Sequence, residues 1–266
     1  MGKVFKITYI VLMVLFLIAW RKTSQLPTPE LMHPELWQAP RQTYHTASTS
    51  LELSYRDREY IVEPLADYEI WGLVVSHNNI NAWYNYYHNE NSVNLKDVCV
   101  VWGDNIKNGA YLQDNLKFYS GEWTCYYRWQ GYLNKPFDPR QLSNNHLLAQ
   151  DVAIQKIIRQ VNVGDQIHLQ GALVDYREKG ETWKRQTSLS RTDENSTSRS
   201  GGACEIMLVE KIDILARHQV WWNRIYDQKG KILGSVIILN LLWFLWPSHK
   251  RPRIQPKGFE PTITVK

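Results

Sequence analysis

Residues 163–178 read VGDQIHLQGALVDYRE, and residues 202–215 return as GACEIMLVEKIDIL. In both segments apolar residues alternate with polar ones, and Gly164-Asp165 places a turn signal directly ahead of the first. A period of two is typical of a half-buried strand. Gly171 lies inside the first strand, where a missing side chain permits a bulge or a sharp bend. These segments predict two long strands of one curved sheet.

The pattern GDQIHLQGALVDY, a strand that curls around a glycine, resembles the strands of small barrels of the OB type. Any strongly curved antiparallel sheet would show the same pattern. Ahead of the first strand, residues 151–161 change to helical spacing, with Asp151 placed to cap a helix. The fold class that we expect is therefore β-rich α+β: a curved antiparallel sheet or an OB-like barrel with one amphipathic helix.

Both ends of the chain carry uncharged apolar runs, residues 7–20 and 232–246. As helices they would span about 21 and 22 Å, which is short for a bilayer core of ~30 Å. Snorkelling of Lys6 would extend the first run. A cleaved signal peptide is the alternative, but Arg21-Lys22 stands where the cleavage site would lie. We expect an uncleaved N-terminal anchor and a second transmembrane helix that flank the β-rich domain.

The expected organisation is an N-terminal anchor, a Pro/Thr-rich linker, a β-rich extracytoplasmic domain, an interfacial segment with the second transmembrane helix, and a basic disordered tail. These parts cover residues 1–22, 23–50, 51–217, 218–247 and 248–266. HKRPR, which follows the second apolar run, is the strongest basic cluster near either anchor. The positive-inside rule then predicts a bacterial inner-membrane protein with both termini cytoplasmic and the main domain periplasmic.

Charge and composition limit the partners that we expect. The net charge of +5 is concentrated in the tails, so a nucleic-acid partner is not expected. Asn240 inside the second apolar run is costly against lipid and indicates a helix partner. We expect membrane lipid, other membrane or envelope proteins, and a second copy of the chain as partners.

The cysteines are Cys99, Cys125 and Cys204, with no CxxC pair and no spacing that fits zinc. In an oxidising compartment we would expect one disulfide and one free thiol. The sequence does not choose among the three possible pairings, and three reduced thiols are the alternative. Cys99 and Cys125 are the nearest pair, and their bridge would stabilise the fold by about 3 kcal/mol. We expect neither a metal nor a cofactor.

Two clusters of amides and histidines are the first candidates for a working site. They contain the candidate ligand-binding residues His77, Asn78, Asn144 and His146. If the clusters meet in space, two imidazoles and several amides could bind a polar ligand or perform general acid–base chemistry. The alternative is that Ser and Asn are ordinary turn and cap residues.

A further candidate is Arg191 with Asp193 in the polar loop, since an Arg–carboxylate pair can hold an anion. In a loop rich in Ser and Thr such a pair is more often solvent-exposed charge. Cys204 as a nucleophile would need a neighbouring base. His77, His146 and His168 are candidates for that base, and the sequence does not choose among them.

Several stretches together resemble an uncharacterised family of membrane-anchored bacterial proteins: SHNN, DVCVVWGDN, SGEWTCYYRW, LSNNHLL, VGDQI and GACE. The resemblance implies location and domain extent and carries no activity. The chain shows none of the familiar hydrolase or phosphate-binding motifs. We therefore expect a binding or assembly module of an envelope complex. The alternatives are an envelope hydrolase or transferase that uses His77 and His146, and a thiol-based sensor whose three cysteines exchange disulfides.

Overall fold

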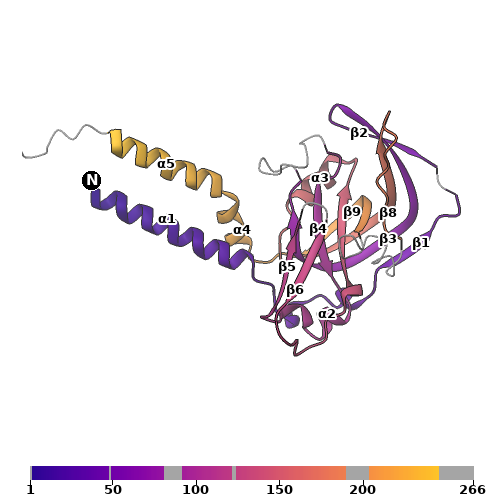
Figure 1. Ribbon diagram of the computed structural model, residues 1–266, viewed down its shortest axis with the longest axis horizontal. Helices are drawn as coiled ribbons and strands as arrows, with labels where there is room; N and C mark the ends of the chain where they lie inside the picture. Colours follow the sequence, from indigo (N-terminus) through magenta and orange to yellow (C-terminus); the bar gives the residue numbers. More distant parts are fainter. Residues whose placement is uncertain (1, 48, 81–91, 122–123, 190–203, 246–266) are drawn as a thin grey trace, which may run out of the picture.

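The computed structural model describes residues 2–47, 49–80, 92–121, 124–189 and 204–245, and shows a β-rich domain from which two helices project (Figure 1). The strands are β1 Arg41–Tyr44, β2 Leu51–Tyr55, β3 Arg58–Asn78, β4 Lys96–Val101, β5 Leu116–Ser120, β6 Cys125–Trp129, β7 Leu142–Leu148, β8 Gln166–Glu178 and β9 Cys204–Ala216. The α-helices are α1 Gly2–Thr23, α2 Asp104–Lys107, α3 Val152–Arg159, α4 Val220–Asp227 and α5 Lys229–Leu245. The prediction of a β-rich domain is confirmed.

The main sheet closes on itself. Its strand order is β1-β3-β4-β7-β9-β8, and β8 also pairs with β3, so that β3, β4, β7, β9 and β8 form a ring. The ring has the strand number of a small OB-type barrel, and closure leaves these five strands without an open edge. The predicted alternative of a purely antiparallel sheet is wrong, because β7 and β9 run parallel. Their connection passes through α3 and β8, which leaves room for a parallel pairing.

The barrel curves where the strand pairing shifts register. β3 has register shifts between Pro64 and Ala66 and between Val74 and Ser76. Between β8 and β9 the pairing shifts beside Gly171, where Glu210 of β9 is the extra residue and an added Cβ on Gly171 would stand 2.1 Å from the carbonyl oxygen of Leu208. Only glycine permits that approach of two backbones. The irregularity predicted beside Gly171 is present, but the extra residue belongs to β9 and not to β8.

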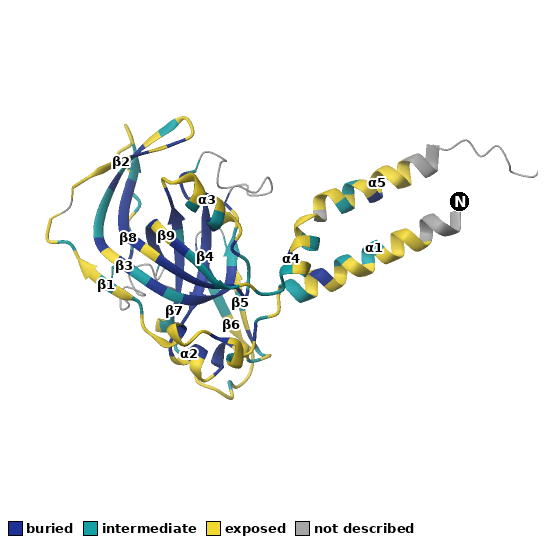
Figure 2. Ribbon diagram, turned by 180° about the vertical axis from the view of Figure 1, so that it is seen from behind, coloured by how far each residue is buried: buried dark blue, intermediate teal, exposed yellow. Residues whose placement is uncertain are grey.

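The barrel core is formed by the buried faces of the ring strands (Figure 2). Ile167, Leu169 and Leu173 of β8 alternate into it, as their period of two predicts. The predicted cap of α3 is present: Asp151 Oδ1 accepts a hydrogen bond from Ala153 N, at the start of the helix, at 2.6 Å. Ile158 of this helix is fully buried against the same core.

A second apolar cluster lies outside the barrel, on the side covered by the β5–β6 hairpin and α2. Residues expected in the linker contribute to it. Leu36 is fully buried, and Tyr111 Oη donates to the carbonyl oxygen of Pro27 at 2.6 Å. β1, also expected in the linker, pairs with β3. Part of the N-terminal segment therefore packs on the domain and covers one side of the sheet.

The prediction of two flanking transmembrane helices is wrong. Among the described residues no helix is long and apolar enough to span a membrane. This finding also overturns the predicted inner-membrane location with a periplasmic domain. The two helices run side by side away from the barrel, and Phe16 of α1 stacks on Tyr226 of α4 (Figures 1 and 2).

Candidate functional site

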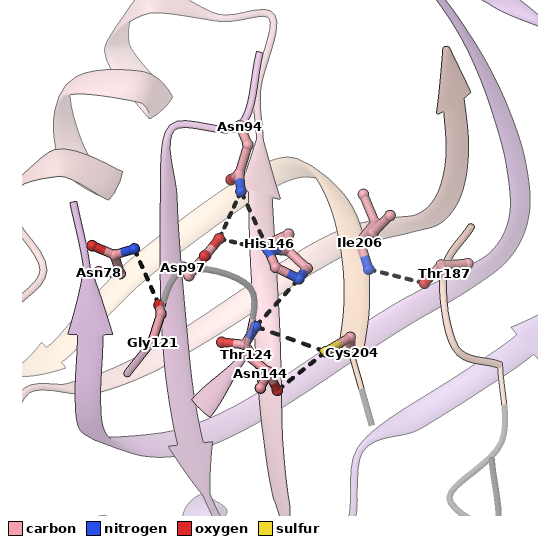
Figure 3. Close-up of polar contacts among 10 residues, drawn as sticks. All are labelled: Asn78, Asn94, Asp97, Gly121, Thr124, Asn144, His146, Thr187, Cys204 and Ile206. Atoms are coloured by element: carbon pink, nitrogen blue, oxygen red, sulfur yellow. Dashed lines mark hydrogen bonds and ion pairs between the residues drawn. The ribbon is translucent and has the colours of Figure 1, made fainter. Parts of the chain in front are cut away.

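The strand register collects four polar side chains on one face of β4, β7 and β9. Asp97 of β4 lies opposite His146 of β7, and Asn144 of β7 lies opposite Cys204 of β9. Residues opposite one another across neighbouring strands share a face, as do residues two apart along one strand. The four side chains therefore meet on the same face, and Figure 3 shows them pointing toward one another.

An aspartate–histidine contact lies at the centre of this cluster. Asp97 Oδ1 is 2.6 Å from His146 Nδ1, and the Asp97 side chain is only 2% exposed. Asn94 Nδ2 donates to the same Asp97 oxygen at 2.6 Å and holds the carboxylate in place. Because Nδ1 of His146 is engaged by Asp97, the imidazole presents its other nitrogen, Nε2, toward β9.

Cys204 lies on the Nε2 side of the imidazole, at the first residue of β9. Asn144 Nδ2 is 3.2 Å from His146 Nε2 and 3.9 Å from Cys204 Sγ. Thr124 Oγ1 is 3.4 Å from the same sulfur. Cys204 is half-buried and lies outside the disulfide of the domain. Its thiol is thus held among hydrogen-bonding groups (Figure 3).

The electrostatics of the cluster favour a charged imidazole. Burial alone would lower the pKa of His146. The charge and hydrogen bond of Asp97, with those of Cys204, outweigh burial and raise this pKa to about 10. At neutral pH His146 is therefore an imidazolium, a cation beside the sulfur of Cys204. Asp97, His146 and Cys204 form a carboxylate–imidazole–sulfur series.

The β5–β6 hairpin covers this face of the barrel. Ser120 Oγ lies 2.8 Å from Ser76 Oγ of β3. Asn78 Nδ2 donates to the Gly121 carbonyl oxygen at 3.2 Å (Figure 3). Cys99 of β4 and Cys125 of β6 form a disulfide with a Cα–Cα distance of 5.7 Å. The hairpin is therefore tied to two strands of the barrel, and it places Thr124 against the sulfur of Cys204.

The candidate residues from the sequence separate into three groups. Asn78, Asn144 and His146 lie on the face just described. His77 lies opposite Val98, which follows Asp97 on β4, so its side chain points to the other face of the sheet. The two histidines therefore do not line one site. Arg191 and Asp193 lie outside the described residues.

Sequence reasoning missed Asp97 and could not assign a base to Cys204. Asp97 is the second residue of the strand KDVCVV, in which every residue is buried. A carboxylate in such a run is a signal, because it is rarely buried without a positively charged or hydrogen-bonding group beside it. The pairing of Cys204 with His146 depends on a parallel register between β7 and β9, which no local pattern encodes.

A second polar cluster lies elsewhere on the barrel. His168 Nε2 is 2.9 Å from Glu69 Oε1, and His168 Nδ1 is 3.2 Å from Asp213 Oδ2. The imidazole stacks on Trp71 at 4.5 Å, with Arg41 above the indole ring. These groups satisfy one another and include no nucleophile. Within the described residues, no group of three or more His, Cys, Asp and Glu side chains has the geometry to hold a metal.

Comparisons of the chain with protein-family models, with curated proteins and with solved structures find no match. The chemistry of the site therefore has to be argued from its own residues.

Proposed function

We propose that this protein is a cysteine-dependent hydrolase or acyltransferase in which Cys204 is the nucleophile. His146 is the acid–base residue, and Asp97 orients it and holds its charge. The observation that supports this most strongly is the 2.6 Å contact from Asp97 to His146, with Cys204 beside the opposite ring nitrogen. A nucleophile, a base and a third group that orients the base is the general arrangement of covalent catalysis.

The burial of the cluster supports a chemical role. A carboxylate as buried as Asp97 loses its hydration, and burying a charged pair is costly even when the pair is well formed. Packing of the barrel alone would be served at least as well by apolar side chains at these positions. Titratable groups whose pKa is strongly shifted by a specific charged neighbour gather at active sites, and His146 is such a group. The predicted binding or assembly role remains a prediction.

The chemistry begins with attack of the Cys204 thiolate on a carbonyl carbon of an ester, thioester or amide. The carbonyl π electrons move to oxygen, and the amide nitrogen of Asn144, 3.9 Å from the sulfur, is placed to donate to that oxyanion. The intermediate expels its leaving group, which takes the proton of His146 Nε2, and a Cys204 thioester remains. Neutral His146 then removes a proton from water or from an acceptor, which displaces the sulfur and restores the ion pair.

Acylation of the purified protein tests the proposal. We expect p-nitrophenyl acetate to release a burst of p-nitrophenol close to one equivalent, with the acetyl group found on Cys204 by peptide mass spectrometry. Cys204→Ser should abolish the burst, and His146→Asn should slow it by about 100-fold. His168→Asn is the matched control, because His168 belongs to the second polar cluster.

Two results would overturn the proposal. One is acylation of Cys204 at equal rates in the wild type and in His146→Asn. The other is acylation of the wild type no faster than that of glutathione at the same pH. Circular dichroism of each variant establishes that the barrel is intact.

A further inference from the structure

The three cysteines of the chain gather at one side of the barrel. Cys99 lies opposite Asn144 in the register, and Asn144 lies opposite Cys204, so the two cysteines share one row and face, two strands apart. Neighbouring strands are about 4.8 Å apart, which puts the Cα atoms of Cys99 and Cys204 about 10 Å apart. A disulfide needs less than about 7 Å, so these two residues cannot bridge without moving the sheet.

Cys125 stands in a different relation to Cys204. It belongs to the hairpin that lies over this row, and its bond to Cys99 holds it there. The preceding residue, Thr124, touches Cys204 Sγ at 3.4 Å (Figure 3). Consecutive Cα atoms are only 3.8 Å apart, so Cys125 lies one residue spacing from the residue that touches Cys204, and a local shift and turn of the hairpin would bring its sulfur to Cys204.

We infer that Cys204 has a second reaction, thiol–disulfide exchange with the Cys99–Cys125 bridge. The Cys204 thiolate attacks Cys125 Sγ along the axis of the existing bond. A Cys204–Cys125 bond forms, the Cys99–Cys125 bond breaks, and Cys99 leaves as a thiolate that is protonated by solvent. One disulfide and one thiol are present before and after, so the step needs no oxidant and no reductant.

The exchange transfers the hairpin from β4 to β9. Two hydrogen bonds oppose this transfer, Ser120 with Ser76 and Gly121 with Asn78. Both lie at the end of the hairpin that carries Cys125. In the exchanged form the sulfur of Cys204 is consumed, so the nucleophile of the proposed function is blocked. The inference rests on the thiolate that the proposed function assigns to Cys204, and does not require acyl transfer.

Two matched variants of the full chain test this inference. Cys99→Ser retains Cys125 and Cys204, and Cys125→Ser retains Cys99 and Cys204. Each is incubated with oxidised glutathione, quenched in acid, alkylated, and digested without reductant for mass spectrometry of linked peptides. We expect at least about tenfold more of the intramolecular bridge in Cys99→Ser than in Cys125→Ser, because only Cys125 is carried by the hairpin.

In the wild type, without added oxidant, the same procedure should detect a Cys125–Cys204 peptide together with alkylated Cys99. Equal bridging in the two variants, or no Cys125–Cys204 peptide in either the wild type or Cys99→Ser, would overturn the inference. Thermal unfolding of both variants verifies that they are folded. Acylation of Cys204 without the bridge contradicts this inference alone, and the bridge without acylation contradicts the hydrolase or transferase proposal alone.

Discussion

Asp97 and His146 face each other across β4 and β7 with 2.6 Å between Oδ1 and Nδ1, and both side chains are nearly withdrawn from solvent. They are 49 residues apart in the chain. This pairing makes the imidazole a cation beside Cys204, and the chemistry proposed for the protein depends on it.

Removal of the carboxylate should make Cys204 less reactive. In Asp97→Asn, burial continues to lower the pKa of His146 and the largest contribution that raised it is lost, so the pKa of His146 falls. The sulfur of Cys204 then loses the cation that the proposed function places beside it. We expect the rate of Cys204 alkylation by iodoacetamide at pH 7 to drop by at least about tenfold. Measured from pH 5 to 10, the profile of rate against pH should shift to higher pH.

Asp213→Asn is the control for this variant, because it removes a carboxylate from the second polar cluster, beside His168. Its alkylation profile should match the wild type. A profile for Asp97→Asn that coincides with that of the wild type would show that Asp97 does not control the thiol.

Two buried basic groups should give opposite pH dependences of stability. The pKa of His146 is raised, so its contribution is complete below pH 6.5 and is lost as the pH rises toward about 10. Burial lowers the pKa of Lys96 from 10.5 to about 7. Above pH 7 the folded state has lost the lysine proton that the unfolded state retains, so stability increases toward pH 10.5. In the wild type the two slopes oppose each other.

Single variants should separate these slopes. In Lys96→Met the free energy of unfolding should fall between pH 7 and 10, and in His146→Gln it should rise, each by at most about 1.4 kcal/mol per pH unit. Urea unfolding at pH 7, 8 and 9 measures both. Parallel slopes in the two variants would contradict the assignment.

Loss of the disulfide should destabilise the domain. Cys99 and Cys125 are separated by 26 residues, and the bridge restricts this segment in the unfolded chain. We expect the double variant Cys99→Ser/Cys125→Ser to lose about 3 kcal/mol of unfolding free energy in urea. Cys204→Ser, which leaves the bridge intact, should lose less than about 1 kcal/mol. Equal losses in both variants would mean that the bridge does not stabilise the fold.

Gly171 of β8, where β8 passes close to β9, should tolerate no side chain. Gly171→Ala would place Cβ 2.1 Å from the Leu208 carbonyl oxygen, and since that atom belongs to the backbone of β9, the strands must separate. We expect a loss of more than about 2 kcal/mol in thermal or urea unfolding. Gly230→Ala is the control, because its Cβ would meet no atom within 4 Å and alanine favours the helix. A fully stable Gly171→Ala protein would rule out this packing of β8 on β9.

Local patterns in the sequence predicted part of the site and part of the fold. Asn78, Asn144 and His146 were candidates, but the partner proposed for His146 was His77, which points to the other face of the sheet. The strand β7 was not predicted, because its sequence LSNNHLL is rich in amides and lacks the β-branched residues that favour strands. Side chains on neighbouring strands meet only through register, which residue type does not specify.

By itself, the sequence determined what depends on nearby residues: the alternation of β8, the irregular pairing beside Gly171, and the cap of α3 at Asp151. It also showed two apolar ends, from which we predicted two transmembrane helices, but among the described residues no helix is long and apolar enough to span a membrane. Only the tertiary structure decided that β3 and β8 close the ring and that β7 lies parallel to β9. The reason is physical: periodicity and capping act over a few residues, whereas Cys204 reaches His146 only through pairing of strands distant in the chain.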